Sequence, residues 1–187
     1  MGPKRRYPAV APVTEHATKA CLSLVCSFIY PFMHVTFFQA KRPMLAALIV
    51  RSCSEEGAAA ITAEDIAAAI LCTLPPRPDT AEMFSAFIWN VAADAGPAGC
   101  HVVKAAGAIP VLLQALRLWP TEDKVVHATT RALFWLCHYG SDDVRSAVRD
   151  VSDSVSLLKS VASSGLECDT DGISRATLVL DLLSAKR

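Results

Sequence analysis

The sequence predicts an all-α fold built from stacked helices. From about Lys41 onward, apolar residues recur at helical spacing, and Gly, Pro, acidic and hydroxyl residues separate the apolar stretches. We find no convincing alternation of apolar and polar residues, which is the pattern of a half-buried strand. Similar short segments return at intervals of about 40 to 46 residues, and this spacing is typical of repeated helical units.

The composition bounds the size and class of the domain. The 187 residues are 52% hydrophobic and 19% charged, which suits one domain with a sizeable core. Basic and acidic residues both number 18, so no global field draws the chain onto nucleic acid or an anionic membrane. The seven cysteines never show a Cys-x-x-Cys spacing and lie mostly in apolar stretches. This usage predicts reduced, buried thiols in the cytosol or nucleus.

Residues 1–40 form a basic and apolar segment that differs from the rest of the chain. A basic cluster at 4–6 precedes an apolar stretch at 20–38, which contains Pro31 and His34. That stretch is borderline in length for a bilayer span, which needs about 20 apolar residues, and it begins late for a signal peptide. We therefore favour helices that cap the core, with a mitochondrial targeting segment or a membrane anchor as the alternatives.

The repeat domain is expected over 41–187, beginning with a partial repeat at 41–54 and a first full repeat at 55–94. Thr62 and Asp65 have the spacing of a capping box, and they predict a helix that runs to about residue 75.

The next helix of this repeat is expected over 80–93. Asp79 or Thr80 can cap its N-terminus with a side-chain oxygen. Gly96 and Pro97 follow its last apolar residue and predict its end.

The most informative motif lies in the repeat at 95–139. Residues 102–116 read Val-Val-Lys-Ala-Ala-Gly-Ala-Ile-Pro-Val-Leu-Leu-Gln-Ala-Leu. Gly107 permits a left-handed turn after one helix, and Pro110 suits the first turn of the next. A third helix is expected over about 124–139. The stretch resembles the armadillo repeat signature.

This resemblance covers roughly residues 41–185. It implies a right-handed α-α superhelix, a short armadillo-type solenoid of about three to four repeats. In the last repeat, 141–185, the residues at 150–155 replace the Gly-x-Ile-Pro turn, and Ser152 or Asp153 is the candidate cap. Armadillo proteins bind extended peptides or partner helices in a groove lined by their third helices, and the repeat itself is not catalytic. The resemblance therefore implies a non-catalytic scaffold or adaptor whose partner is another protein.

The ladder of Trp and Asn that importin-α-type receptors use is essentially absent. In our alignment its Asn places hold Asn90, Leu136 and Leu180, and its Trp places hold Ala86, Ala132 and Ala176. Recognition of nuclear import signals is accordingly disfavoured.

The helix expected at 124–139 divides into two faces. Its predicted core face gathers Val125, Val126, Thr129, Leu133, Leu136 and Cys137. The opposite face combines cationic and aromatic side chains, the types that most often anchor interfaces. With the equivalent side of the preceding repeat, the predicted partner-binding residues are Ser85, Trp89, Lys124, His127, Arg131, Phe134, Trp135 and His138. Packing of Trp89 and Trp135 between repeats is the alternative.

Motifs for chemistry are scarce. Two adjacent Cys-His pairs, at 100–101 and 137–138, could suggest a metal site or a nucleophile, but adjacent helical residues point about 100° apart and no further ligands are suitably spaced. We therefore expect no catalytic residue, metal or cofactor. A helical-repeat nucleic-acid-binding protein or a membrane-associated assembly factor remains the alternative function, although the neutral charge disfavours nucleic acid.

Both ends of the predicted solenoid carry many apolar residues. In the last helix they are Ile173, Ala176, Leu178, Val179, Leu180, Leu182 and Leu183, too many for one buried stripe. We expect these ends to contact an oligomer partner or a larger complex.

Overall fold

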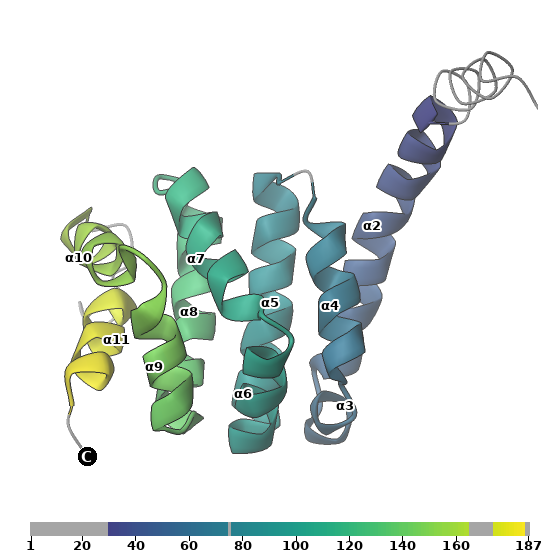
Figure 1. Ribbon diagram of the computed structural model, residues 1–187. Coiled ribbons are helices and arrows are strands. Elements are labelled where there is room, and N and C mark those ends of the chain that lie inside the picture. The colour runs from purple at the N-terminus through teal and green to yellow at the C-terminus, as the bar shows by residue number, and fades with distance from the viewer. Residues whose placement is uncertain (1–29, 75, 165–173, 186–187) are drawn as a thin grey trace, which may run out of the picture. The chain divides into compact units, whose positions relative to one another are not determined.

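The computed structural model describes residues 30–74, 76–164 and 174–185, and over these residues the protein is all-helical, without strands (Figure 1). This confirms the predicted all-α class. In chain order the helices are α2 (Tyr30–Ser52), α3 (Glu55–Ala59), α4 (Ala63–Cys72), α5 (Pro78–Asp94), α6 (Gly96–Ala105), α7 (Ala108–Leu118), α8 (Asp123–Tyr139), α9 (Asp142–Asp150), α10 (Ser154–Ser164) and α11 (Arg175–Ser184).

The chain divides into two compact units, Met1–Ala40 and Lys41–Arg187. Of the first unit, the structure describes only the beginning of α2. The expectations for residues 1–29, including the basic cluster and most of the apolar stretch, therefore lie outside the described residues.

Helices of the larger unit recur in sets of three: α3 to α5, α6 to α8, and α9 to α11. Each helix contacts its counterpart in the next set, so that α3 meets α6 and α6 meets α9, α4 meets α7 and α7 meets α10, and α5 meets α8 and α8 meets α11. The contact between α5 and α8 is the most extensive of all. The third helices of the sets thus form a row, α5–α8–α11.

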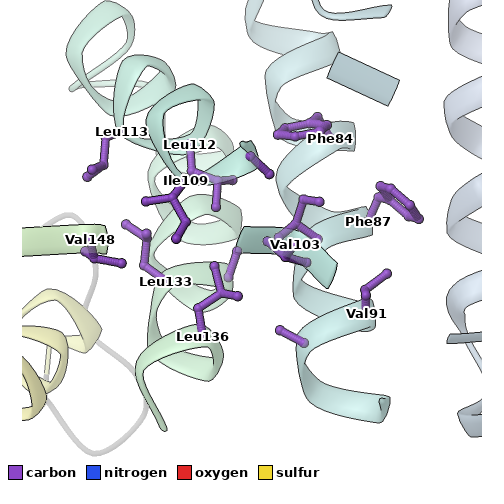
Figure 2. Close-up of a cluster of buried hydrophobic side chains, with 14 of the residues drawn as sticks. Phe84, Phe87, Val91, Val103, Ile109, Leu112, Leu113, Leu133, Leu136 and Val148 are labelled. Carbon is purple, nitrogen blue, oxygen red and sulfur yellow. The ribbon is translucent and has the colours of Figure 1, made fainter. Parts of the chain in front are cut away.

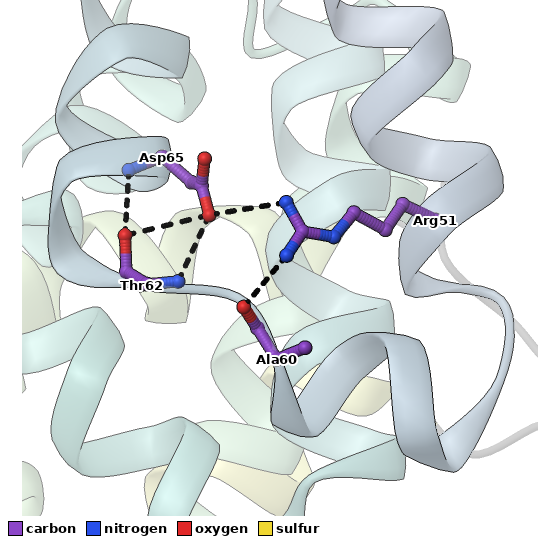
Figure 3. Close-up of polar contacts among 4 residues, drawn as sticks. All are labelled: Arg51, Ala60, Thr62 and Asp65. Carbon is purple, nitrogen blue, oxygen red and sulfur yellow. Dashed lines mark hydrogen bonds and ion pairs between the residues drawn. The ribbon is translucent and has the colours of Figure 1, made fainter.

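A capping box begins α4, as predicted (Figure 3). The Thr62 hydroxyl accepts a hydrogen bond from the Asp65 backbone N–H at 3.3 Å, and the Asp65 carboxylate accepts one from the Thr62 N–H at 3.1 Å. Arg51 of α2 donates to the Ala60 carbonyl at 2.9 Å and lies 3.5 Å from the same carboxylate. These contacts join the end of α2 to the turn before α4. The helix ends at Cys72, slightly earlier than predicted.

The predicted cap of α5 is wrong. The helix begins at Pro78, and Arg77 occupies the cap position without a side-chain hydrogen bond. Proline suits the first helical position because its φ is already helical and its missing N–H would have no partner there. The Asp79 carboxylate accepts a hydrogen bond from the Thr80 N–H at 2.9 Å, inside the first turn.

Gly107 separates α6 from α7 in the way the motif predicts. Its φ of 72° is left-handed, a conformation that side chains with a Cβ rarely adopt. Its N–H donates to the Lys104 carbonyl at 3.0 Å, and Pro110 lies in the first turn of α7.

The corresponding turn of the last set uses a non-glycine residue. Asp153 has a φ of 61° immediately before α10. Its backbone carbonyl accepts hydrogen bonds from the Leu157 N–H and the Ser156 hydroxyl, both at 2.9 Å. The sharp turn is therefore kept although the Gly-x-Ile-Pro sequence is lost.

One cluster of buried apolar side chains runs through the larger unit (Figure 2). The predicted core face of α8 is confirmed, because all six of its residues are buried. In α11, Ala176, Val179 and Leu183 are buried, and Leu180 and Leu182 pack against the same cluster. The last helix therefore covers more of its apolar surface than its sequence suggests, and Ile173 lies outside the described residues.

Candidate partner-binding surface

The α5–α8 contact contains a buried polar bridge. The hydroxyls of Ser85 and Thr129 are 2.8 Å apart, and both side chains are completely buried. Ser85 was a predicted partner-binding residue, and this prediction is wrong. Ser85 lies on the side of α5 that α8 covers. The Ser85 hydroxyl therefore bonds to Thr129 and does not reach the surface.

The Arg131 guanidinium of α8 lies over the Trp89 ring of α5. The guanidinium carbon of Arg131 lies 3.6 Å from the centre of the Trp89 ring. Both residues are half-buried, and Trp89 also packs against the apolar core. A cation over an indole face is attracted by the ring quadrupole, by about 0.5–1 kcal/mol at exposed sites and more where water is excluded. The contact holds two long side chains in one arrangement across α5 and α8.

Four aromatic rings follow one another along the C-terminal half of α8. Phe134 stacks with His138 at 5.5 Å between ring centres, and Trp135 stacks with Tyr139 at 5.2 Å. Phe134 and Trp135 are themselves edge-to-face at 5.2 Å. Both stacked pairs are four residues apart, so they lie one turn from each other on the helix surface. We call these four residues the α8 aromatic cluster.

The polar part of the surface extends towards α11. Lys124 and His127 are exposed on α8. His127 Nδ1 lies 3.3 Å from a guanidinium nitrogen of Arg175, the first residue of α11. Since a guanidinium has only donors, His127 accepts this hydrogen bond through Nδ1.

The structure brings most of the predicted residues onto one pair of helices. Arg131, Phe134 and Trp135 are half-buried, and Lys124, His127 and His138 are exposed. Trp89 and Trp135 each pack against the core while staying partly accessible. The surface we consider below, the α5–α8 surface, consists of Trp89, Lys124, His127, Arg131, Phe134, Trp135 and His138.

Two members of this neighbourhood were missed from the sequence. Tyr139 stacks on Trp135, and its place four residues further along the helix was a sufficient signal. Arg175 belongs to another set of helices, and its distance from His127 depends on how α11 packs on α8. Helical periodicity alone does not show such a contact.

The two Cys-His pairs separate into buried thiols and exposed imidazoles. Cys100 and Cys137 are completely buried, whereas His101 and His138 are exposed. Burial raises the pKa of the Cys100 thiol to about 11 and that of Cys137 to about 12, because the thiolate loses its hydration. These thiols are poor nucleophiles at neutral pH.

Cys53 corrects the expectation that the thiols are buried. It is exposed at the end of α2, and its thiol donates to the Ile49 carbonyl at 3.1 Å. Cys72 is buried, and desolvation raises the pKa of its thiol.

A surface ion pair connects α6 with the start of α9. Lys104 donates to the Asp143 carboxylate, which also accepts a hydrogen bond from the Ser141 hydroxyl. The hydrogen bond from Lys104, followed by that from Ser141, lowers the pKa of Asp143 to about 2. The carboxylate therefore stays charged under ordinary conditions and joins consecutive helix sets electrostatically.

Metal-binding clusters and membrane-spanning helices are the two other features of interest. Within the described ranges, no three His, Cys, Asp or Glu side chains are arranged to hold a metal ion. In the same part of the chain, no single helix has the length and apolarity to cross a bilayer; α6 and α7 meet the length and composition test only as a pair bent by 79°.

Comparison with known proteins gives no further guide to this surface. No family model matches the chain, and no match is found among curated proteins or solved structures.

Proposed function

We propose that this protein is a non-catalytic adaptor that binds a peptide or helix of another protein on the α5–α8 surface. The observation that carries the proposal is the placement of Arg131 over Trp89. Tryptophan and arginine are the residues most enriched among those that dominate binding energy at interfaces. Here their geometry is set before any partner arrives.

The α8 aromatic cluster supports the same proposal. Its rings offer apolar area, while His138 and Tyr139 are exposed and add polar groups at the edge. Stacking between neighbouring rings restricts their rotation, so less side-chain entropy is lost when a partner covers them. A partner that places an apolar or aromatic side chain here and an acceptor near Arg131 would fit both parts of the surface.

We further propose that the larger unit is a short armadillo-type solenoid, a right-handed superhelix acting in the cytosol or nucleus. Contacts between helices three apart in the chain support this arrangement, as does the left-handed Gly107 between α6 and α7. In such an arrangement, the row α5–α8–α11 would supply the binding side.

The proposal is tested by comparing the full chain with two charge-reversal variants in affinity purification and mass spectrometry. Arg131→Glu removes the cation above Trp89 and places a carboxylate there. Lys159→Glu makes the same change at an exposed position of α10 and is the matched control. We expect one partner that the wild type and Lys159→Glu retain and that Arg131→Glu loses by at least about tenfold.

The captured partner must also bind directly. Isothermal titration with the purified partner should reproduce the loss in Arg131→Glu, while circular dichroism shows unchanged helix content. A partner equally retained by both variants would contradict the assignment of this surface. Loss of the partner after nuclease treatment would instead indicate nucleic acid as the bridge.

A further inference from the structure

A second surface, independent of the α5–α8 surface, is an apolar groove between α4 and α7. It has a volume of about 480 Å³ and is lined by the C-terminal part of α4, the N-terminal part of α5, α7 and Trp119. Phe84 forms part of its wall. This volume falls within the range of about 300–1,000 Å³ that is common for ligand sites. None of the residues of the α5–α8 surface lines it.

Two polar residues of the groove wall, Thr73 and Arg117, form hydrogen bonds within the protein. The Thr73 hydroxyl donates to the Ile70 carbonyl at 2.7 Å. The Arg117 guanidinium donates to the Ser152 carbonyl and lies 3.5 Å from the Gln114 side-chain oxygen. Because these groups have internal partners, the groove offers an occupant mainly apolar contact.

Two leucines of the groove wall are substantially exposed. Leu74 and Leu118 line the groove and yet are 51% and 43% exposed. Large apolar side chains with this exposure, adjoining one cavity, are typical of an interaction site. Leu74 follows α4 and Leu118 ends α7, so an occupant that covers both leucines spans the groove between these two helices.

Positive charge flanks this apolar surface. Arg117 is exposed on α7, and Arg77 follows the groove residue Pro76 at the start of α5. Arg77 lies 3.6 Å from Asp79, which also lies 3.5 Å from Arg42. The positive charge at the groove wall is therefore that of Arg117, the charged residue among those lining it, and it favours an acidic occupant.

We propose that this groove binds an acidic amphipathic helix of a partner protein. Apolar side chains one and two turns apart on that helix would enter the cavity and cover Leu74 and Leu118. Carboxylates beside them would lie near Arg117. An amphipathic helix in a hydrophobic groove presents its anchors at positions i, i+4 and i+7, which suits an apolar groove between two helices.

Trp119 provides a local probe for the test. The chain has three tryptophans, and two of them, Trp89 and Trp135, belong to the α5–α8 surface. The indole N–H signals of the ¹⁵N-labelled full chain would be assigned with Trp119→Phe. A synthetic helix of about 15 residues, with Leu at i, i+4 and i+7 and Glu beside them, is then titrated. We expect saturable shifts of the Trp119 signal and unchanged Trp89 and Trp135 signals.

Matched variants and peptides separate the apolar and electrostatic contributions. Leu118→Asp changes an exposed groove residue, whereas Leu71→Asp changes an exposed leucine of α4 that does not line the groove. We expect Leu118→Asp to weaken binding at least about tenfold and Leu71→Asp to leave it unchanged. Arg117→Glu, or a peptide with Lys in place of Glu, should weaken binding several-fold, and more so at low salt.

Several outcomes would overturn the proposal. These are the absence of saturable binding, equal binding of the acidic and basic peptides, or equal losses in Leu118→Asp and Leu71→Asp. Displacement of the peptide by a second copy of the chain, seen as self-association that Leu118→Asp abolishes, would assign the groove to an oligomer. Saturation by oleate with no response to the peptide would assign it to a lipid. Because Trp89 and Trp135 are read separately, failure here leaves the α5–α8 proposal standing.

Discussion

The hydroxyl groups of Ser85 and Thr129 meet at 2.8 Å in the middle of the α5–α8 contact. Apolar packing tolerates small sliding movements, but a buried hydrogen bond has one satisfactory geometry. The bridge therefore favours one register of α8 on α5. Arg131 is two residues beyond Thr129, and Trp89 is four residues beyond Ser85, so the same register places the cation over the indole ring.

Ser85→Ala should lower the free energy of unfolding by about 1–3 kcal/mol, because the buried Thr129 hydroxyl loses its partner across the interface. Urea unfolding followed by circular dichroism measures this change. The double variant Ser85→Ala with Thr129→Val, which removes both polar groups, should lose less than the sum of the two single variants. Strict additivity would show that the bridge contributes no coupling between the helices.

Arg145→Met should also destabilise the fold, by about 1–3 kcal/mol. Arg145 is 4% exposed and donates to the Cys137 carbonyl at 2.8 Å, near the end of α8 where backbone carbonyls lack helical partners. It also lies 2.9 Å from Asp142, whose side chain is largely exposed. Asp142→Asn is the control and should change stability by less than about 1 kcal/mol. Similar losses of stability in Arg145→Met and Asp142→Asn would mean that Arg145 stabilises the fold through the ion pair with Asp142, and not through the Cys137 carbonyl.

Gly107→Ala should cost about 1 kcal/mol or more, because alanine is strained at a φ of 72°. No atom lies within 4 Å of an added Cβ, so backbone strain and not collision is the expected cause. Gly107→Asn should be less destabilising, since asparagine tolerates the left-handed conformation better. Thermal unfolding of the three proteins tests the order Gly, Asn, Ala. An alanine variant as stable as the wild type would contradict it.

The thiols should differ sharply in reactivity. At pH 8, iodoacetamide should modify exposed Cys53 at least about a hundredfold faster than Cys100 or Cys137, whose thiolates are suppressed by burial. Peptide mapping after timed quenching measures each rate. Equal rates in native buffer would show that the helices around Cys100 and Cys137 open readily.

The same thiols predict a pH dependence of stability. Their pKa values are raised from 9.0, so above that pH the unfolded chain releases protons that the folded chain retains. The free energy of unfolding should therefore fall as the pH rises from about 9 towards 11. Cys137→Ala should reduce this slope relative to the wild type. An unchanged slope in that variant would assign the effect to other groups.

The sequence predicted best those features that depend on neighbouring residues. The box of Thr62 and Asp65, the turn at Gly107 and the buried stripe of α8 all follow from local spacing, and the structure contains each of them. The start of α5 was predicted less well, because proline at the first helical position competes with the side-chain caps at Asp79 and Thr80.

Features that depend on contacts between helices distant in the sequence were not predictable in this way. Helical periodicity assigned Ser85 to an outward face, but that side of α5 is covered by α8. The groove at Trp119 likewise depends on the spacing between α4 and α7, since its walls come from helices that are distant in the sequence. Composition identifies these residues as apolar and cannot say which of them enclose a space.

Helix α5 contributes to both surfaces through opposite ends. Its N-terminal residues Ala81 and Phe84 line the groove, and Trp89 lies beneath Arg131 nearer its C-terminus. Its 17 residues span only about 26 Å along an unbroken helix. Ligands bound at the groove and at the α5–α8 surface would both contact this one helix. Association between the two ligands would then be a unimolecular event, at an effective concentration of about millimolar. Mutations that loosen α5 would weaken both binding sites together, because α5 contributes residues to each of them.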